Sequence, residues 1–91
     1  MTYRNYRDPI YRKWRLSVYK RDKFKCRWPG CKNKGRRTKI HAHHILKWSS
    51  HPRLRFELNN GITLCRQHHK SIQGKEDHFV RLFLTLLKDK K

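Results

Sequence analysis

Apolar residues near the N-terminus of the chain recur with the spacing of a helix. Ile10, Trp14 and Val18 follow one another at intervals of four residues, which places them on one face of a helix of about three to four turns. Asp8-Pro9 comes just before them, and an aspartate N-cap followed by proline is typical of a helix start. The pattern therefore predicts a helix that begins at Pro9 and buries this apolar face against the core. The other face of this helix carries the basic residues Arg12, Lys13, Arg15 and Lys20.

Two further helices are predicted in the second half of the chain. Residues 65–73 predict a short helix ended by Gly74, because glycine is favoured just past a helix end. Residues 76–88 predict the last helix, and we interpret its apolar stripe as part of the core. The members of that stripe are Phe79, Leu82, Phe83, Leu86 and Leu87.

Between the first and second helices, residues 39–45 alternate in a way that predicts a β-strand. At a period of two residues, His43 shares a face with His41 and Ile45, whereas His44 lies on the other face with Ala42. Residues 47–60 predict a loop that closes with a turn at Asn60-Gly61, and residues 62–64 predict a strand returning beside the first. The two neighbours His43 and His44 would therefore point to opposite sides of one rigid element.

The length and composition of the chain predict one small domain that needs additional stabilisation. With 91 residues there is room for a single core, and we expect a flexible basic arm over residues 1–8 and one domain over residues 9–91. Only 35% of the residues are hydrophobic, and small domains of this kind are often stabilised by a metal or by disulfides. The 3 cysteines are an odd number, which favours a metal site or free thiols over a disulfide framework.

The charge of the chain favours a polyanionic partner. Lysine and arginine total 25 against 6 acidic residues, a formal net charge of +19. Basic side chains that dock on phosphates release condensed counterions, so nucleic acid is the expected partner. An acidic membrane surface is the weaker alternative, because no basic amphipathic helix stands out. The sequence has no apolar run of membrane-spanning length and no signal-peptide core, so we expect a cytoplasmic protein in a reducing compartment.

Three cysteines and a histidine form a candidate metal-binding set. Cys26 and Cys31 flank Pro29-Gly30, a dipeptide that favours a tight turn and would bring the two sulfurs together. Cys65 and His68 form a CxxH pair later in the chain. A set of three cysteines and one histidine is suited to tetrahedral zinc.

Taken in order, these motifs resemble those of the HNH endonuclease family. The stretches that carry the resemblance are residues 40–45, residues 58–65 and His68-His69-Lys70, and the match covers roughly residues 9–80. It is closest in kind to the small zinc-containing HNH proteins of phages and mobile elements. The resemblance implies an α+β domain, a small ββα-metal fold with a structural zinc knuckle and flanking N- and C-terminal helices.

The resemblance also implies a role for each motif residue. His43 and His69 match the ligands of a catalytic divalent metal, and His44 matches the general base that deprotonates the attacking water. Asn60 matches the central asparagine, which braces the loop between the strands or, in some members, touches the metal. The catalytic metal would be Mg²⁺ or Mn²⁺, with Ni²⁺ and Zn²⁺ as further candidates. The structural zinc would be held by Cys26, Cys31, Cys65 and His68.

The chain departs from the family pattern at three places. His68 stands where many relatives have cysteine, so the roles of His68 and His69 could be exchanged, although the CxxH spacing favours His68 for zinc. Gln73 stands where many relatives carry a further histidine, and an amide is a poor metal ligand. The CxxxxC pair is longer than the commoner CxxC.

Several other residues are candidates for contacts with DNA. The loop arginines Arg53 and Arg55 are expected to meet phosphates, and Gln73 can hydrogen-bond a phosphate or water. His41 could be a third active-site residue, but we favour a half-exposed strand histidine that touches phosphate or nothing. Lys47 completes the basic set. Trp28 and Trp48 are expected to pack beside the zinc knuckle and the loop rather than to stack on bases.

The function implied by the resemblance is a metal-dependent endonuclease that nicks or cuts double-stranded DNA with low sequence specificity. The alternative is a non-catalytic, zinc-stabilised nucleic-acid-binding module, which the presence of Gln73 favours mildly. A ribosomal type of RNA-binding protein fits the charge but gives no reason for the paired histidines. A bacterial or phage-infected cell is the implied setting, with phage packaging proteins as candidate partners. A monomer is compatible with the sequence, as are roles in packaging, homing and defence.

Overall fold

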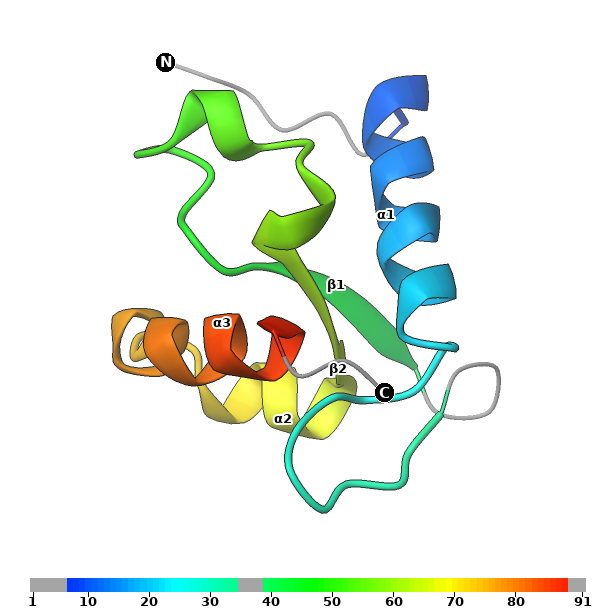
Figure 1. The fold of residues 1–91 in the computed structure, drawn as a ribbon, viewed down its shortest axis with the longest axis vertical. Coiled ribbons are helices and arrows are strands. Elements are labelled where there is room, and N and C mark those ends of the chain that lie inside the picture. The colour runs from blue at the N-terminus through cyan, green and yellow to red at the C-terminus, as the bar shows by residue number, and fades with distance from the viewer. Residues whose placement is uncertain (1–6, 35–38, 89–91) are drawn as a thin grey trace.

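A computed structural model describes residues 7–34 and 39–88 of the chain, and in this part a two-stranded antiparallel sheet lies between helices (Figure 1). The main elements, in chain order, are α1 (Pro9–Arg21), β1 (Ile40–His44), β2 (Gly61–Cys65), α2 (Arg66–Ser71) and α3 (Val80–Lys88). Short 3₁₀ helices occupy Pro52–Leu54, Leu58–Asn60 and Glu76–Phe79. The predicted α+β class is confirmed. Most of the predicted basic arm lies outside the described residues.

Helix α1 starts as the sequence predicts but buries a different face. Asp8 caps it, because its Oδ1 accepts a hydrogen bond of 2.8 Å from the amide of Ile10. The predicted burial of Ile10 is wrong, since this side chain is 59% exposed. Tyr11 is buried in its place, next to Trp14 and Val18. Positions 10 and 11 are both within reach of position 14 on a helix, and the aromatic ring of Tyr11 is the one that packs beside Trp14, 5.7 Å away.

The two strands pair in antiparallel register, with Ile40 opposite Cys65 and His44 opposite Gly61. The connection between them is long and contains two of the 3₁₀ helices, and the predicted turn at Asn60-Gly61 is the end of that connection. A Cβ atom at Gly61 would lie 2.6 Å from both Trp14 and Val18 side chains. Glycine at the start of β2 therefore allows α1 to lie close against the sheet.

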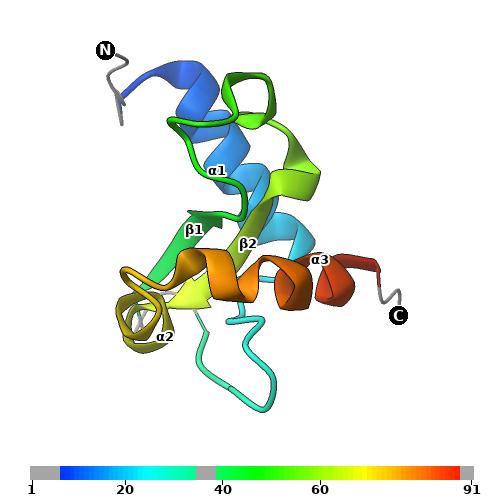
Figure 2. The same ribbon diagram turned by 90° about the vertical axis from the view of Figure 1, so that its left-hand side faces the viewer.

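The sheet has helices on both faces (Figures 1 and 2). On one face, Tyr11, Trp14 and Val18 of α1 pack against Ala42 and Trp48. On the other face, the core is formed by residues of the sheet, α2 and α3 and of the connections beside them. Its fully buried apolar side chains are Ile45, Ile62, Leu64, Ile72 and Phe83.

The C-terminal helices are close to the prediction. Helix α2 is shorter than predicted, and Gly74 follows it with a φ of +82°, a left-handed conformation that glycine adopts readily. The predicted helix over residues 76–88 begins as a 3₁₀ turn, Glu76–Phe79, before α3 continues it. Its apolar stripe packs against the core around Phe83, as predicted. No helix in the described ranges has both the length and the apolar character needed to span a bilayer.

The end of α1 is joined to the rest of the domain through Asp22, whose side chain is buried. Its carboxylate accepts hydrogen bonds from the Arg21 side chain and from the Thr63 amide, at 2.8–2.9 Å, and forms an ion pair with Arg27. Burial would raise the pKa of this carboxyl, but the hydrogen bonds and the charge of Arg21, together with Thr63, lower it below its usual value. The ionised carboxylate therefore links α1, the segment that follows it and β2.

Candidate functional site

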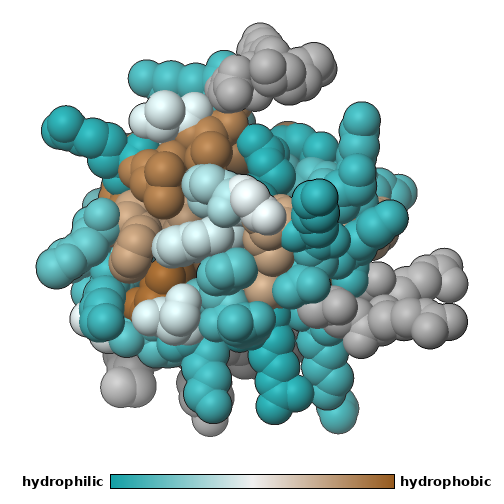
Figure 3. Space-filling view, turned by 90° about the horizontal axis from the view of Figure 1, so that it is seen from below, coloured by the Kyte–Doolittle hydropathy of each residue, from teal (hydrophilic) through white to brown (hydrophobic). Residues whose placement is uncertain are grey.

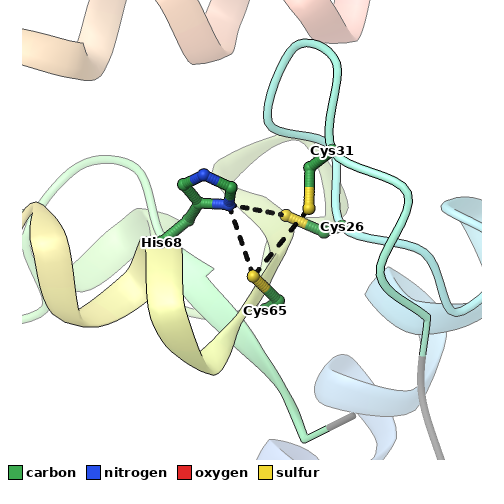
Figure 4. A group of neighbouring side chains, drawn as sticks. All are labelled: Cys26, Cys31, Cys65 and His68. Atoms are coloured by element: carbon green, nitrogen blue, oxygen red, sulfur yellow. Dashed lines mark hydrogen bonds between the residues drawn. The ribbon is translucent and has the colours of Figure 1, made fainter.

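Three cysteines and one histidine meet beside the start of α2 (Figure 4). The sulfur atoms of Cys26, Cys31 and Cys65 and a ring nitrogen of His68 all lie within 4.8 Å of one another. The Cys31–Cys65 Sγ atoms are 4.0 Å apart, and Nδ1 of His68 is 3.3 Å from Sγ of Cys65 and 3.7 Å from Sγ of Cys26. Four ligands on a tetrahedral zinc, with Zn–S bonds of about 2.3 Å, are separated by about 3.8 Å. The predicted set is therefore brought together with the spacing of a four-ligand metal site.

The local backbone explains why these four residues converge. The Cys26 amide donates to the carbonyl of Asn33 at 2.9 Å and the Cys31 amide to the carbonyl of Trp28 at 2.9 Å, so this segment folds back on itself. Gly30 has a φ of +80°, as the predicted Pro-Gly turn requires. Cys65 ends β2 and precedes α2, so that a residue three positions later returns to the same side of the first helical turn.

The thiols of the cluster differ in how readily they lose a proton. Burial would raise the pKa of the Cys65 thiol, but hydrogen bonds from Asn33 and His68 outweigh burial and lower that pKa to about 6. Burial raises the pKa of Cys26 to about 12. A cation that binds here must therefore displace protons from some thiols but finds one thiolate already favoured at neutral pH. Trp28 lies flat against His68 with ring centres 4.8 Å apart, so its predicted packing beside the knuckle is confirmed.

A second group of histidines lies on the same side of the sheet as α2. His43 is 7% exposed, and its ring centre is 5.6 Å from that of His69 in an edge-to-face arrangement. His41 stacks on His69 at 4.7 Å. Burial, together with the charges of Arg66 and Lys39, lowers the pKa of His41 and favours its neutral form. The structure thus places His68 with the cysteines and His69 with the strand histidines, as the CxxH spacing predicts.

His44 lies on the opposite face of β1, in contact with α1. Its Nε2 is 2.9 Å from the carbonyl oxygen of Arg55. Because a carbonyl only accepts hydrogen bonds, Nε2 carries the proton in the neutral ring, and Nδ1 is then the basic nitrogen. The indole of Trp14 stacks on the imidazole at 4.1 Å, nearly parallel, and fixes the plane of the ring.

Asn60 stabilises the connection between β1 and β2, which contains the Arg55 carbonyl. It is 4% exposed, and its Oδ1 accepts from the Leu46 amide at 2.8 Å. Its Nδ2 donates to the carbonyls of Leu46 at 3.2 Å and Leu54 at 3.1 Å. Of the two roles implied for this residue, its contacts fit the bracing of the loop.

An open groove of about 950 Å³ runs beside β1 and collects side chains from both faces of the strand. His41, His43 and His44 line it together with His69 and Gln73. Within the described residues β1 pairs with β2 alone, so its other edge is available to form the floor of this groove. The two predicted metal ligands and the predicted base therefore face one common space. The remaining lining residues are Tyr11, Arg15, Tyr19, Ile40, Ala42, Lys47, Trp48, Ser49, Gly74 and Glu76.

The two predicted phosphate contacts from the loop lie elsewhere. Arg53 is exposed on a 3₁₀ helix and does not line the groove. Arg55 donates through Nε to the carbonyl of Trp48 at 2.7 Å, and its guanidinium lies 4.5 Å from the centre of the indole. Arg55 thus supports the loop, and the predicted packing of Trp48 there is confirmed. Lys47 does line the groove, and its Nζ is 3.6 Å from Asp77 in an exposed ion pair.

Sequence reasoning missed two parts of the groove. The first is the wall formed by α1, where Tyr11, Arg15 and Tyr19 recur every four residues, a period that could have indicated a common face. The second is Glu76, whose pKa is lowered by hydrogen bonds from its own amide and from Gly74 and by the nearby charge of His43. No local motif marks Glu76, because it reaches the groove only through the turn after α2.

Comparison with known proteins leaves the site to be interpreted from its own residues. No family model, no curated protein and no solved structure matches this chain.

Proposed function

We propose that the protein is a metal-dependent DNA endonuclease of the HNH type. The observation that carries the proposal is the placement of two neighbouring histidines on opposite faces of β1. His43 lies near His69 on one face, and His44 is oriented on the other face by a hydrogen bond to a backbone carbonyl. Both histidines line the same groove. The chain order of β1, β2 and α2, with the histidines at its two ends, supports the ββα-metal assignment.

In this proposal His43 and His69 hold a catalytic divalent ion. When metal–nitrogen bonds are about 2.1 Å long, two imidazoles on one ion have ring centres about 5 Å apart. The observed 5.6 Å fits that requirement with a small adjustment of the rings. A divalent ion held by two neutral ligands supplies Lewis-acid stabilisation of the phosphate charge. Gln73 and Glu76 also line the groove, and the Glu76 carboxylate would be the better further ligand of the two.

His44 acts as the general base. Its Nδ1 takes a proton from the attacking water, while the hydrogen bond from Nε2 to the Arg55 carbonyl stabilises the imidazolium that forms. The unperturbed pKa of histidine, about 6.5, suits proton transfer at neutral pH. Trp14 keeps the ring from rotating, because its indole covers one face of the imidazole.

We infer that the Cys26, Cys31, Cys65 and His68 cluster holds a structural zinc. Three cysteines and one histidine in a tetrahedral set are typical of such sites. The ion would join the segment after α1 to the start of α2, and α2 carries His69. Its role is to hold the groove wall in place rather than to take part in the reaction.

The substrate that we propose is double-stranded DNA, and the charge of the chain supports a polyphosphate partner. A net charge of +19 on 91 residues favours a polyphosphate partner, and a chain this small has little surface with which to read a long sequence. On the face seen in Figure 3, hydrophilic side chains surround an apolar area. We expect low sequence specificity and a cytoplasmic site of action in a bacterial or phage-infected cell.

Cleavage of supercoiled plasmid tests the proposal. The zinc-loaded protein should nick or cut the plasmid with Mg²⁺ or Mn²⁺, and EDTA should stop the reaction. His44→Ala should lower the cleavage rate by about 10²–10⁴-fold, the range for loss of a general base, while DNA binding persists. His78→Ala is the matched control, because His78 is exposed and outside the groove. Binding without cleavage by the wild type across Mg²⁺, Mn²⁺, Ni²⁺ and Zn²⁺ would favour the non-catalytic module instead.

A further inference from the structure

One wall of the groove is formed by three residues of α1 that share a helical face. Tyr11, Arg15 and Tyr19 recur every four residues, and all three line the groove opposite His69 and Gln73. Tyr11 is buried, and the hydroxyl of Tyr19 donates to the carbonyl of Ile40 at 3.2 Å. These contacts hold the wall against β1, so Arg15 projects from a fixed support between two rings.

The charge of Arg15 is held in place but is not neutralised by a carboxylate. Its guanidinium carbon lies 5.7 Å from the ring centre of Tyr11, within the range of a cation–π contact. In residues 7–34 and 39–88, no ion pair involves Arg15. By contrast, Arg21 and Arg27 both pair with the buried Asp22. Burial raises the pKa of Tyr19 and the charge of Arg15 opposes that rise, which places the cation beside the second ring as well.

We propose that Arg15 is a phosphate-binding residue that holds the DNA backbone beside the phosphate that is cleaved. The inference rests on the proposed function, because it takes the histidine end of the groove as the place of cleavage. A planar guanidinium can bind two phosphate oxygens at once, and the cation–π contact with Tyr11 reduces the entropy lost when it does so. A groove of about 950 Å³ is at the upper end of the size of sites that enclose whole ligands, so it accepts more than a single phosphate group.

Two cations line the groove with the histidines. Arg15 belongs to the α1 wall, and Lys47 follows the end of β1. Lys47 is exposed and forms an ion pair with Asp77, whereas Arg15 is half-buried and makes a cation–π contact with Tyr11. We therefore assign the stronger flanking contact to Arg15. The proposed occupant is a nucleic-acid backbone, because the positive charge of Arg15 on this wall complements negatively charged phosphates.

The test measures DNA binding by the zinc-loaded protein without added Mg²⁺ or Mn²⁺, so that the substrate stays intact. Arg15→Ala should raise the dissociation constant for a short DNA duplex about tenfold and reduce the magnitude of the log–log salt slope by about 0.9, the value for one lost phosphate contact. Arg15→Lys, which keeps the charge without the planar fork, should recover part of the affinity. Arg12→Ala is the matched control: it removes the same charge from the same helix, but Arg12 is exposed and outside the groove.

Equal effects of Arg15→Ala and Arg12→Ala on affinity and salt slope would overturn the assignment, because the charge alone would then explain binding. Arg15→Met keeps the alkyl contact with Tyr11 without the charge, and it should bind as weakly as Arg15→Ala; affinity restored by Met would also overturn the assignment. Because these measurements need no turnover, they remain decisive for Arg15 even if the wild type fails to cleave plasmid. In that case the nuclease proposal fails, and the binding data for the Arg15 and Arg12 variants still decide whether Arg15 binds phosphate.

Discussion

His43 and His44 are chemically identical neighbours whose surroundings differ because successive strand residues face opposite sides of a sheet. His43 lies against His69 and Phe83, beside α2 and α3. His44 lies against Trp14 and makes a hydrogen bond with the Arg55 carbonyl. One face thus provides a pair of imidazoles and the other provides one imidazole with a defined tautomer.

At the residue scale, substitution of Asn60 distinguishes a brace from a metal ligand. Asn60→Asp keeps the acceptor for the Leu46 amide but replaces the donor to the carbonyls of Leu46 and Leu54 with an oxygen. We expect the free energy of unfolding to fall by about 2–3 kcal/mol and cleavage to fall with it, because buried acceptors lose their partner. Urea unfolding of both proteins checks this. Aspartate is a good metal ligand, so a variant with tighter metal binding and full activity would show that Asn60 serves the metal.

At the element scale, two groups of side chains connect the elements around the groove. Asp22 joins the end of α1 to β2 and to Arg27. A metal bound by the Cys/His cluster would join the segment after α1 to the start of α2. Both groups connect different elements, and such connections add stability to a domain whose apolar core is small.

The Asp22 contacts predict a dependence of stability on pH. The pKa of this carboxyl is lowered in the folded protein, so its contribution to stability is present above the unfolded value of about 3.9 and is lost as the pH falls through the lower folded value. Asp22→Asn should lower the free energy of unfolding by about 2–3 kcal/mol at pH 7, a value below that for fully buried pairs because both arginines are partly exposed. The difference between the two proteins, measured by urea unfolding, should shrink steadily below pH 4. A difference that is constant from pH 7 to pH 2 would contradict this account.

Removal of one cluster ligand tests the metal site. The wild type should retain one zinc per chain through dialysis, and Cys26→Ser should lose the zinc and lower the melting temperature by more than about 10 °C. His68→Cys is the matched control, because cysteine is also a zinc ligand and should keep the metal. Zinc content by atomic emission and thermal unfolding by circular dichroism provide the readouts. A zinc-free Cys26→Ser protein with unchanged melting temperature would exclude a structural role for the cluster.

At the scale of the whole molecule, the net charge dominates the expected interaction with DNA. A formal charge of +19 lies on a chain with 6 acidic residues, of which Asp22 and Asp77 form ion pairs with basic side chains. Binding should therefore be largely electrostatic and weakly selective for sequence. With about six phosphate contacts, the logarithm of the binding constant should fall against the logarithm of salt concentration with a slope near −5. Fluorescence anisotropy of a labelled duplex at several salt concentrations measures it, and a slope near zero would contradict electrostatic binding.

The periodic parts of the fold could be predicted from the sequence, whereas the choice between neighbouring positions could not. Alternation around His43 and His44 was sufficient to place them on opposite faces, and the CxxH spacing was sufficient to assign His68 to the cluster. The buried face of α1 was misplaced by one residue, because Ile10 and Tyr11 are both near Trp14 and only the sheet decides between them. The groove wall with Arg15 shares a helical period, but nothing in the sequence indicates that this face of α1 lies beside the histidines.

We propose that two neighbouring residues of β1 have different roles: His43 is a ligand of the catalytic metal, and His44 is the general base that accepts a proton from water. Isothermal titration of Mn²⁺ into the zinc-loaded protein, with plasmid cleavage measured on the same samples, tests it most directly. We predict that His44→Ala binds Mn²⁺ as tightly as the wild type but does not cleave, and that His43→Ala loses both Mn²⁺ binding and cleavage. A His44→Ala protein that still cleaves, or a His43→Ala protein that binds Mn²⁺ and cleaves normally, would contradict the claim.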